Sequence, residues 1–166
     1  TRDAELATRV RRLRNHGMEP RYYHQEVGGN FRLDAIQTAL LRIKLEHLES
    51  YHAGRARHAQ AYQKELAGIE GLILPQEGAG KRHVWNQFTV KVGDGRRDDL
   101  RKHLQAAGIG SEIYYPLTLD HQPCFKDVGR GRETIRVAHE LAQSVLSLPV
   151  FPEMTDAERE EVVAAV

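Results

Sequence analysis

The sequence has one cysteine, no long apolar run and no excess of charge of either sign in its 166 residues. The single cysteine, Cys124, excludes an internal disulfide framework and a cysteine-rich zinc module, and we expect it to be packed rather than reactive. Lysine and arginine total 24 against 23 acidic residues, so no net field favours nucleic acid or an anionic membrane as a partner. Short apolar runs predict no membrane-spanning segment. A cytoplasmic location fits these absences best.

The chain has nine histidines, which are candidate metal ligands. His47, His52 and His58 fall on one predicted helix, but no two of them are three or four residues apart, so they share no face. The sequence also has no paired cysteines and no His-x-x-x-His motif. We therefore predict no metal site and interpret the histidines as surface or interface residues.

Hydrophobic periodicity predicts two helices in the first part of the chain, separated by a polar loop. The first runs from about Asp3 to His16 and ends before Gly17. The second keeps one apolar face over residues 33–67, and Gly54 in its middle is expected to loosen or kink it. A helix this long cannot be covered by one small core, so we expect it to pack against another domain or another subunit.

The second half of the chain alternates strand and helix patterns, which predicts an α+β domain with one small sheet and helices on one face. The predicted strands are residues 72–74, 84–92, 109–115 and 146–150. The predicted helices are residues 98–107, 133–144 and 155–166, the last beginning with the capping box Thr155-Asp156-Ala157-Glu158. The chain thus divides into residues 1–32, 33–67 and 68–166. Helical patterns that begin and end at the chain termini lead us to expect a fragment of a longer protein.

Gly28-Gly29-Asn30, which leads into the long helix, is a candidate anion site. Backbone N–H groups at a helix start and an asparagine amide together suit a phosphate, and Arg32 adds a charged donor. The alternative is an ordinary turn and helix cap, since glycine and asparagine are common turn residues.

Tyr114-Tyr115-Pro116, at the end of a predicted strand, is a second candidate. Tyrosines in this position offer hydroxyl donors and a ring face to a polar ligand. The alternative is an aromatic pair at the edge of a strand, where aromatic residues are common.

Several motifs together, in order and spacing, resemble the DegT/DnrJ/StrS family of sugar aminotransferases across nearly the whole chain. In the first part they are Leu13-Arg14-Asn15-His16-Gly17, Tyr23-His24 and Gly28-x-Asn30-x-Arg32-Leu33-Asp34-x-x-Gln37-x-Ala39. In the second part they are His83-Val84-Trp85-Asn86-x-Phe88, Gly108-Ile109-Gly110, Tyr114-Tyr115-Pro116-Leu117, Gln122-Pro123 and Leu146-Ser147-Leu148-Pro149 with Pro152 and Thr155.

This resemblance implies an aspartate-aminotransferase fold with pyridoxal 5′-phosphate as cofactor, held as a Schiff base by a lysine of a large N-terminal domain. The implied reaction moves an amino group from an amino acid, commonly glutamate, to a nucleotide-linked keto-sugar. The chain is then the end of the large domain with an interface loop, the long connecting helix and the small C-terminal domain. None of its lysines matches the Schiff-base position, so we expect the chain alone to be inactive. They are Lys44, Lys64, Lys81, Lys91, Lys102 and Lys126.

The resemblance also implies a homodimer with the active site at the subunit interface. In that arrangement Asn30 reaches the cofactor phosphate of the partner subunit, with Arg32 beside it. The expected substrate-binding residues are Tyr114 and Tyr115, whose loop approaches the sugar, and His24 in the interface loop. Cofactor and substrate contacts are therefore expected from two separate parts of the chain.

The chain departs from the family pattern at three places, which leaves the identity of the sugar open. Gly29 stands where an aromatic residue is frequent, and Tyr114 stands where many members have histidine. A histidine that is common after the Pro-Leu pair falls on Asp120, with His121 one place later. Two other functions also stay open: a stand-alone dimerisation or sugar-binding module, and a sugar dehydratase of the same fold in which histidine replaces the lysine.

Overall fold

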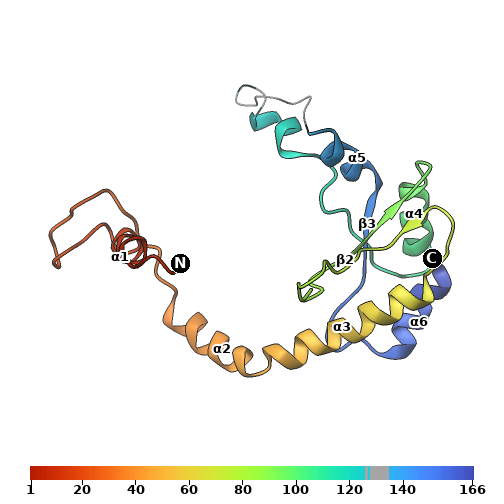
Figure 1. The fold of residues 1–166 in the computed structure, drawn as a ribbon, viewed down its shortest axis with the longest axis horizontal. Coiled ribbons are helices and arrows are strands. Elements are labelled where there is room, and N and C mark those ends of the chain that lie inside the picture. The colour runs from red at the N-terminus through yellow and green to blue at the C-terminus, as the bar shows by residue number, and fades with distance from the viewer. Residues whose placement is uncertain (126, 128–134) are drawn as a thin grey trace. The chain divides into compact units, whose positions relative to one another are not determined.

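The computed structural model describes residues 1–125, 127 and 135–166 of the chain (Figure 1). It divides into two compact units, Thr1–His47 and Leu48–Val166. Within the described residues, no helix is both long and apolar enough to cross a bilayer.

Unit 1 begins with helix α1, Ala4–Leu13. The loop after α1 returns to the end of this helix, where the Gly29 N–H donates to the Leu13 carbonyl at 3.0 Å. Helix α2, Ala35–Glu46, follows and is capped by the carboxylate of Asp34. Helix α1 ends three residues earlier than expected.

The predicted helix over residues 33–67 is two helices, α2 and α3 (Leu48–Glu65), with His47 between them. The break has a local cause: the His47 N–H bonds at 3.1 Å to the carbonyl three residues earlier, which interrupts the α-helical ladder. Gly54, the expected kink, lies inside α3 without ending it. A Cβ on Gly54 would lie 2.7 Å from the Pro152 carbonyl, so this glycine permits close backbone packing instead.

Unit 2 is built on a three-stranded antiparallel sheet in the order β1, β2, β3. The strands are β1 Leu72–Ile73, β2 Phe88–Val92 and β3 Val145–Leu148. The register places Phe88 opposite Leu148 and Val90 opposite Leu146. Because residues two apart on a strand share a face, these four buried side chains form one apolar surface of the sheet.

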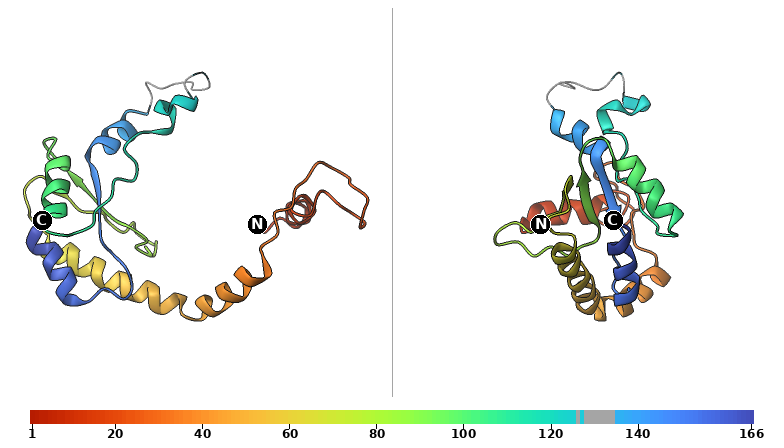
Figure 2. Two further views of the ribbon diagram at one scale, coloured as in Figure 1. Left: turned by 180° about the vertical axis from the view of Figure 1, so that it is seen from behind. Right: turned by 90° about the vertical axis from the view of Figure 1, so that its right-hand side faces the viewer.

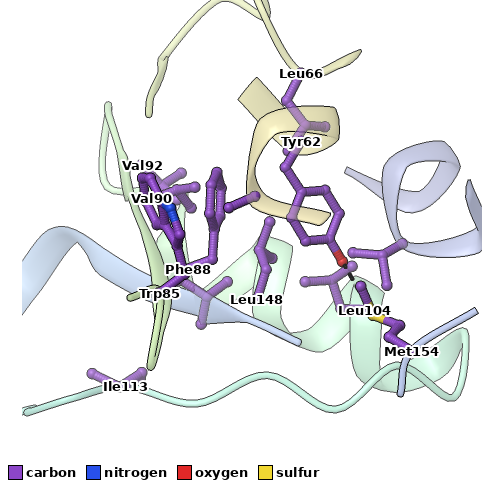
Figure 3. Close-up of a cluster of buried hydrophobic side chains, with 13 residues drawn as sticks. Tyr62, Leu66, Trp85, Phe88, Val90, Val92, Leu104, Ile113, Leu148 and Met154 are labelled. Atoms are coloured by element: carbon purple, nitrogen blue, oxygen red, sulfur yellow. Dashed lines mark hydrogen bonds between the residues drawn. The ribbon is translucent and has the colours of Figure 1, made fainter. Parts of the chain in front are cut away.

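Three helices of unit 2 pack over that apolar surface. They are α3, α4 (Arg97–Ala106) and α6 (Asp156–Ala165), while α5 (Arg136–Ser144) leads directly into β3. Figures 1 and 2 show α6 running alongside α3. In the core, the ring centroids of Tyr62 in α3 and Phe88 in β2 are 5.0 Å apart. Figure 3 shows the two rings among the buried side chains. The α+β class and the small sheet are therefore as predicted.

The predicted strand over residues 109–115 is not formed. Glu112 makes one isolated antiparallel bridge with Ser147, with hydrogen bonds of 3.1 and 2.8 Å between their backbones. The other residues of this segment find no partner on a neighbouring strand, and Pro116, which has no N–H, follows the segment directly. The predicted strand over residues 84–92 starts only at Phe88, since Trp85 has a φ of 51°, outside the extended region.

The remaining predicted helices agree closely with the structure. Residues 133 and 134 of the helix predicted over 133–144 lie outside the described residues, and α5 occupies the rest except Ile135, its N-cap. The capping box is confirmed: the Thr155 hydroxyl accepts from the Glu158 N–H, and the Glu158 carboxylate accepts from the Thr155 N–H. Cys124, expected to be packed, is exposed because its one-turn 3-10 helix, Pro123–Phe125, buries no residue.

Candidate functional site

Asn30 and Arg32 form one hydrogen-bonded pair on the surface of unit 1. Arg32 Nε donates to Asn30 Oδ1 at 2.9 Å, and the Arg32 backbone N–H approaches the same oxygen at 3.4 Å. Because these donors occupy the carboxamide oxygen, the amide nitrogen points away, and it meets no acceptor among the described residues. An amide and a guanidinium are thus both available to an anion here.

The backbone around Asn30 is held against the end of α1. Asn30 and Asn15 form an isolated antiparallel bridge. A Cβ on Gly28 would lie 2.4 Å from the Gly17 nitrogen, so the two segments approach as closely as they do only because residue 28 is glycine. The Gly28 position therefore helps to set where the Asn30 side chain emerges.

The helix start expected just after Gly28-Gly29-Asn30 lies further along the chain. Helix α2 begins only at Ala35, and its first turn is capped by the Asp34 carboxylate, which would repel a phosphate. The N–H of Gly29 is already bonded to the Leu13 carbonyl at 3.0 Å. Side chains, not helix N–H groups, are therefore the anion donors in this segment.

The loop that carries His24 is fastened by ion pairs and by the histidine itself. Glu26 accepts from Arg12 at 2.7 Å and from Arg9 at 3.1 Å, and the hydrogen bond from Arg12 holds the pKa of Glu26 below its ordinary value. His24 Nδ1 donates to the His16 carbonyl at 2.7 Å, which leaves Nε2 as an acceptor. The exposed His24 ring lines a hollow of about 430 Å³ in unit 1.

Tyr114 and Tyr115 lie in unit 2 and turn toward different hollows. Their rings are edge-on with centroids 5.7 Å apart, and the peptide bond between them is cis. Tyr114 lines a hollow of about 380 Å³ with a mixed lining, together with Glu112 and Ser147. Tyr115, 70% exposed, borders an apolar groove of about 730 Å³ closed on its other side by α5. The two tyrosines therefore border two different hollows while their rings stay in contact.

Unit 2 also holds a cluster of metal-ligating side chains that no spacing in the sequence indicates. Asp120 and His121 lie on the 3-10 helix Leu119–His121, and His139 of α5 reaches them across the fold. Hydrogen bonds from Thr118 and then from His139 lower the pKa of Asp120, although burial opposes them. The prediction of no metal site considered spacings within one helix, whereas these two histidines are 18 residues apart in sequence.

Comparison with solved structures defines the class of protein. A crystal structure of DesV from S. venezuelae superposes on 99% of this chain with a TM-score of 0.93 and 39% sequence identity, and the match covers 44% of that chain. The fold is therefore the C-terminal part of an aspartate-aminotransferase-like protein, as the sequence predicted. The chain belongs to the DegT/DnrJ/EryC1/StrS aminotransferase family, which matches residues 1–166.

Curated relatives support the same family. A UDP-N-acetyl-3-dehydro-α-D-glucosamine 3-aminotransferase of Acidithiobacillus ferrooxidans is 42% identical over 166 residues. A dTDP-3-amino-3,4,6-trideoxy-α-D-glucose transaminase of Streptomyces venezuelae is 39% identical over the same length. The chain spans less than half of these relatives, 42% and 43% respectively. The family depends on pyridoxal 5′-phosphate, which confirms the cofactor predicted for the family.

Proposed function

We propose that this chain is the C-terminal portion of an aminotransferase that moves an amino group from an amino acid to a nucleotide-linked keto-sugar. Glutamate is the expected donor. The observation that carries the proposal is the match of the whole chain to nucleotide-sugar aminotransferases at about 40% identity. The relatives differ in the sugar and the nucleotide that their names print, so neither is assigned here.

The side chains of unit 1 fit the phosphate of pyridoxal 5′-phosphate. A phosphate needs several hydrogen-bond donors, and the Asn30 amide and the Arg32 guanidinium are two exposed donors on neighbouring side chains. A hydrogen bond of 2.9 Å from Arg32 Nε to Asn30 Oδ1 holds these side chains together. When bound, the cofactor supplies an electrophilic group that takes up and releases the amine. In the proposal, Asn30 donates to the phosphate, and Arg32 orients Asn30 and adds positive charge.

The proposal also assigns roles to the other predicted site residues. His24 offers its Nε2 as an acceptor at the edge of the unit 1 hollow. Tyr114 lines a hollow together with Glu112 and offers its hydroxyl to a sugar, and Tyr115 offers an exposed ring face. The protein acts as a cytoplasmic homodimer in this proposal, with Asn30 directed to the cofactor of the partner subunit.

The chain by itself is proposed to be inactive. The described lysines lie on helices, on a strand or in a loop, and none follows a serine-rich turn, while Lys126 lies outside the described residues. Without a lysine that binds the cofactor, no base is positioned to take the proton from the carbon that bears the amine of the donor. A lysine in the preceding part of the full-length protein would supply it, whereas a histidine at that place would favour the dehydratase.

Cofactor retention by the full-length protein tests the role of Asn30. We expect Asn30→Ala to weaken the affinity for pyridoxal 5′-phosphate about ten- to hundred-fold, since one charge-assisted hydrogen bond contributes roughly 1.5–3 kcal/mol. Gln37→Ala removes an exposed amide from the same unit and serves as the control. Unchanged affinity in the Asn30 variant would refute this assignment. Amino transfer from glutamate to UDP- or dTDP-linked keto-sugars tests the activity separately.

A further inference from the structure

Asp120, His121 and His139 bring three metal-ligating side chains together from two elements of unit 2. His139 Nε2 lies 2.9 Å from Asp120 Oδ2, and His121 Nδ1 lies 3.5 Å from the same oxygen. One ligand atom from each residue can be chosen so that all lie within 4.8 Å of one another. No other described residues form such a group of three.

The spacing of these atoms suits a small divalent ion. Zinc binds imidazole nitrogen and carboxylate oxygen at roughly 2.0–2.2 Å, so tetrahedral ligand atoms lie about 3.3–3.6 Å apart. The two separations from Asp120 Oδ2, 2.9 and 3.5 Å, lie close to that range. The two imidazole nitrogens lie within 4.8 Å of each other, so rotation of the side chains can bring them into it. The set of two imidazoles and one carboxylate is one that zinc and other first-row transition metals prefer.

A hydrogen-bonded pair of Asp120 and His139 explains only part of this arrangement. The second oxygen of Asp120, Oδ1, is buried and meets no hydrogen-bond donor among the residues that the structure describes. The His121 ring stands 4.3 Å from the His139 ring, with its Nδ1 near the Thr118 hydroxyl at 3.1 Å. An enclosed carboxylate oxygen without a donor, beside two imidazoles, is what a cation would complete.

We propose that Asp120, His121 and His139 bind one divalent first-row transition-metal ion of the zinc type. The ion would link the 3-10 helix Leu119–His121 to α5. It would thereby hold the residues just after Tyr115 against α5. His121 is 46% exposed at its side chain, which leaves room for water as a further ligand. Three protein ligands with an open position make a site that exchanges its metal more readily than a closed structural site.

Zinc binding to the full-length protein tests the proposal. After treatment with a chelator, the protein is dialysed against Zn²⁺ and the bound metal is counted per chain. We expect His139→Gln to lower the Zn²⁺ affinity of one site by at least about ten-fold. Replacing a residue that merely supports a metal ligand already lowers metal affinity by about that factor. His103→Gln removes an exposed histidine of α4 and is expected to leave the same site intact.

A second variant and a second metal keep the test independent of folding. Asp120→Asn retains the shape of the side chain and removes its charge, and it is also expected to lose the site. Co²⁺ in the wild-type protein should give visible absorption bands that His139→Gln lacks. Equal Zn²⁺ binding by wild type and His139→Gln, or Co²⁺ spectra that do not change with the variant, would overturn the proposal. Loss of zinc binding does not depend on whether the protein transfers an amine.

Discussion

Arg32 Nε donates a hydrogen bond of 2.9 Å to Asn30 Oδ1, two residues earlier in the chain. The bond assigns the orientation of the carboxamide, because an oxygen facing Arg32 leaves the amide N–H2 facing outward. The amide that we propose as a donor to the cofactor phosphate is therefore oriented before any ligand arrives. Such orientation lowers the entropic cost of binding.

Arg32 is expected to act on cofactor binding through Asn30. In the full-length protein, Arg32→Gln should weaken the affinity for pyridoxal 5′-phosphate about two- to ten-fold, which corresponds to one hydrogen bond of modest net strength. Fluorescence titration with the cofactor measures the change. Arg2→Gln, an exposed arginine on the same unit, should have no effect. The double variant Arg32→Gln/Asn30→Ala provides the check. If its loss of binding free energy for the cofactor equals the sum of the losses in the two single variants, the residues act independently and the orienting role is wrong.

Gly17 is expected to be essential to the loop that presents His24. Its φ is +67°, and a Cβ would lie 1.8 Å from the Glu26 carbonyl oxygen. Gly17→Ala should therefore cost more than the roughly 1–2 kcal/mol of a left-handed alanine alone. Amide hydrogen exchange over residues 15–31 should become faster. Gly68→Ala is the matched control, since Gly68 has a φ of +82° but no atom within 4 Å of its Cβ. Equal exchange in the two variants would contradict the clash.

Tyr62 should stabilise unit 2 by its hydroxyl as well as by its ring. The hydroxyl donates to the Pro149 carbonyl at 3.0 Å, and burial raises the pKa of Tyr62, so the donor stays protonated. We expect Tyr62→Phe to lower the free energy of unfolding by about 1–2 kcal/mol, because the carbonyl loses a buried partner. Urea unfolding followed by fluorescence of Trp85, the single tryptophan, measures this. Tyr23→Phe, at an exposed position, should change nothing, and a similar loss there would argue against the Pro149 bond.

His58 should make the stability of unit 2 depend on pH. Burial, and then the nearby Arg57 and Arg159, lower the pKa of His58 below its ordinary 6.5, while Asp156 and the Met154 backbone oppose them. The folded protein then binds this proton less readily than the unfolded chain. Stability is full above about pH 6.5 and falls as the pH drops toward the folded pKa, by at most about 1.4 kcal/mol per pH unit for one proton.

The pH prediction is checked by urea unfolding between pH 5 and pH 8, again with Trp85 as the probe. His58→Gln cannot titrate and should reduce the loss of stability at low pH. His103→Gln replaces an exposed histidine and should keep the wild-type dependence. A pH dependence that is identical in wild type and in His58→Gln would show that other groups cause it.

Local patterns predicted most elements because their signals lie within a few residues. The Thr155–Glu158 capping box and the alternation from Phe88 to Val92 specify a helix start and a strand without help from the rest of the chain. The prediction of one long helix was wrong at His47, where the apolar pattern continues but the α-helical hydrogen bonds are interrupted. The strand expected over residues 109–115 failed because a strand also needs a partner, and only Glu112 finds one in Ser147.

The sequence by itself determined the family, the order of the elements and the two segments that carry Asn30 and Tyr114, because these depend on residues close together in the chain. Tertiary structure alone decided that side chains rather than helix N–H groups offer donors at Asn30. It also decided that His121 meets His139 at one carboxylate. Contacts between residues far apart in sequence leave no spacing pattern, since their geometry is set by how the core packs and not by the chain between them.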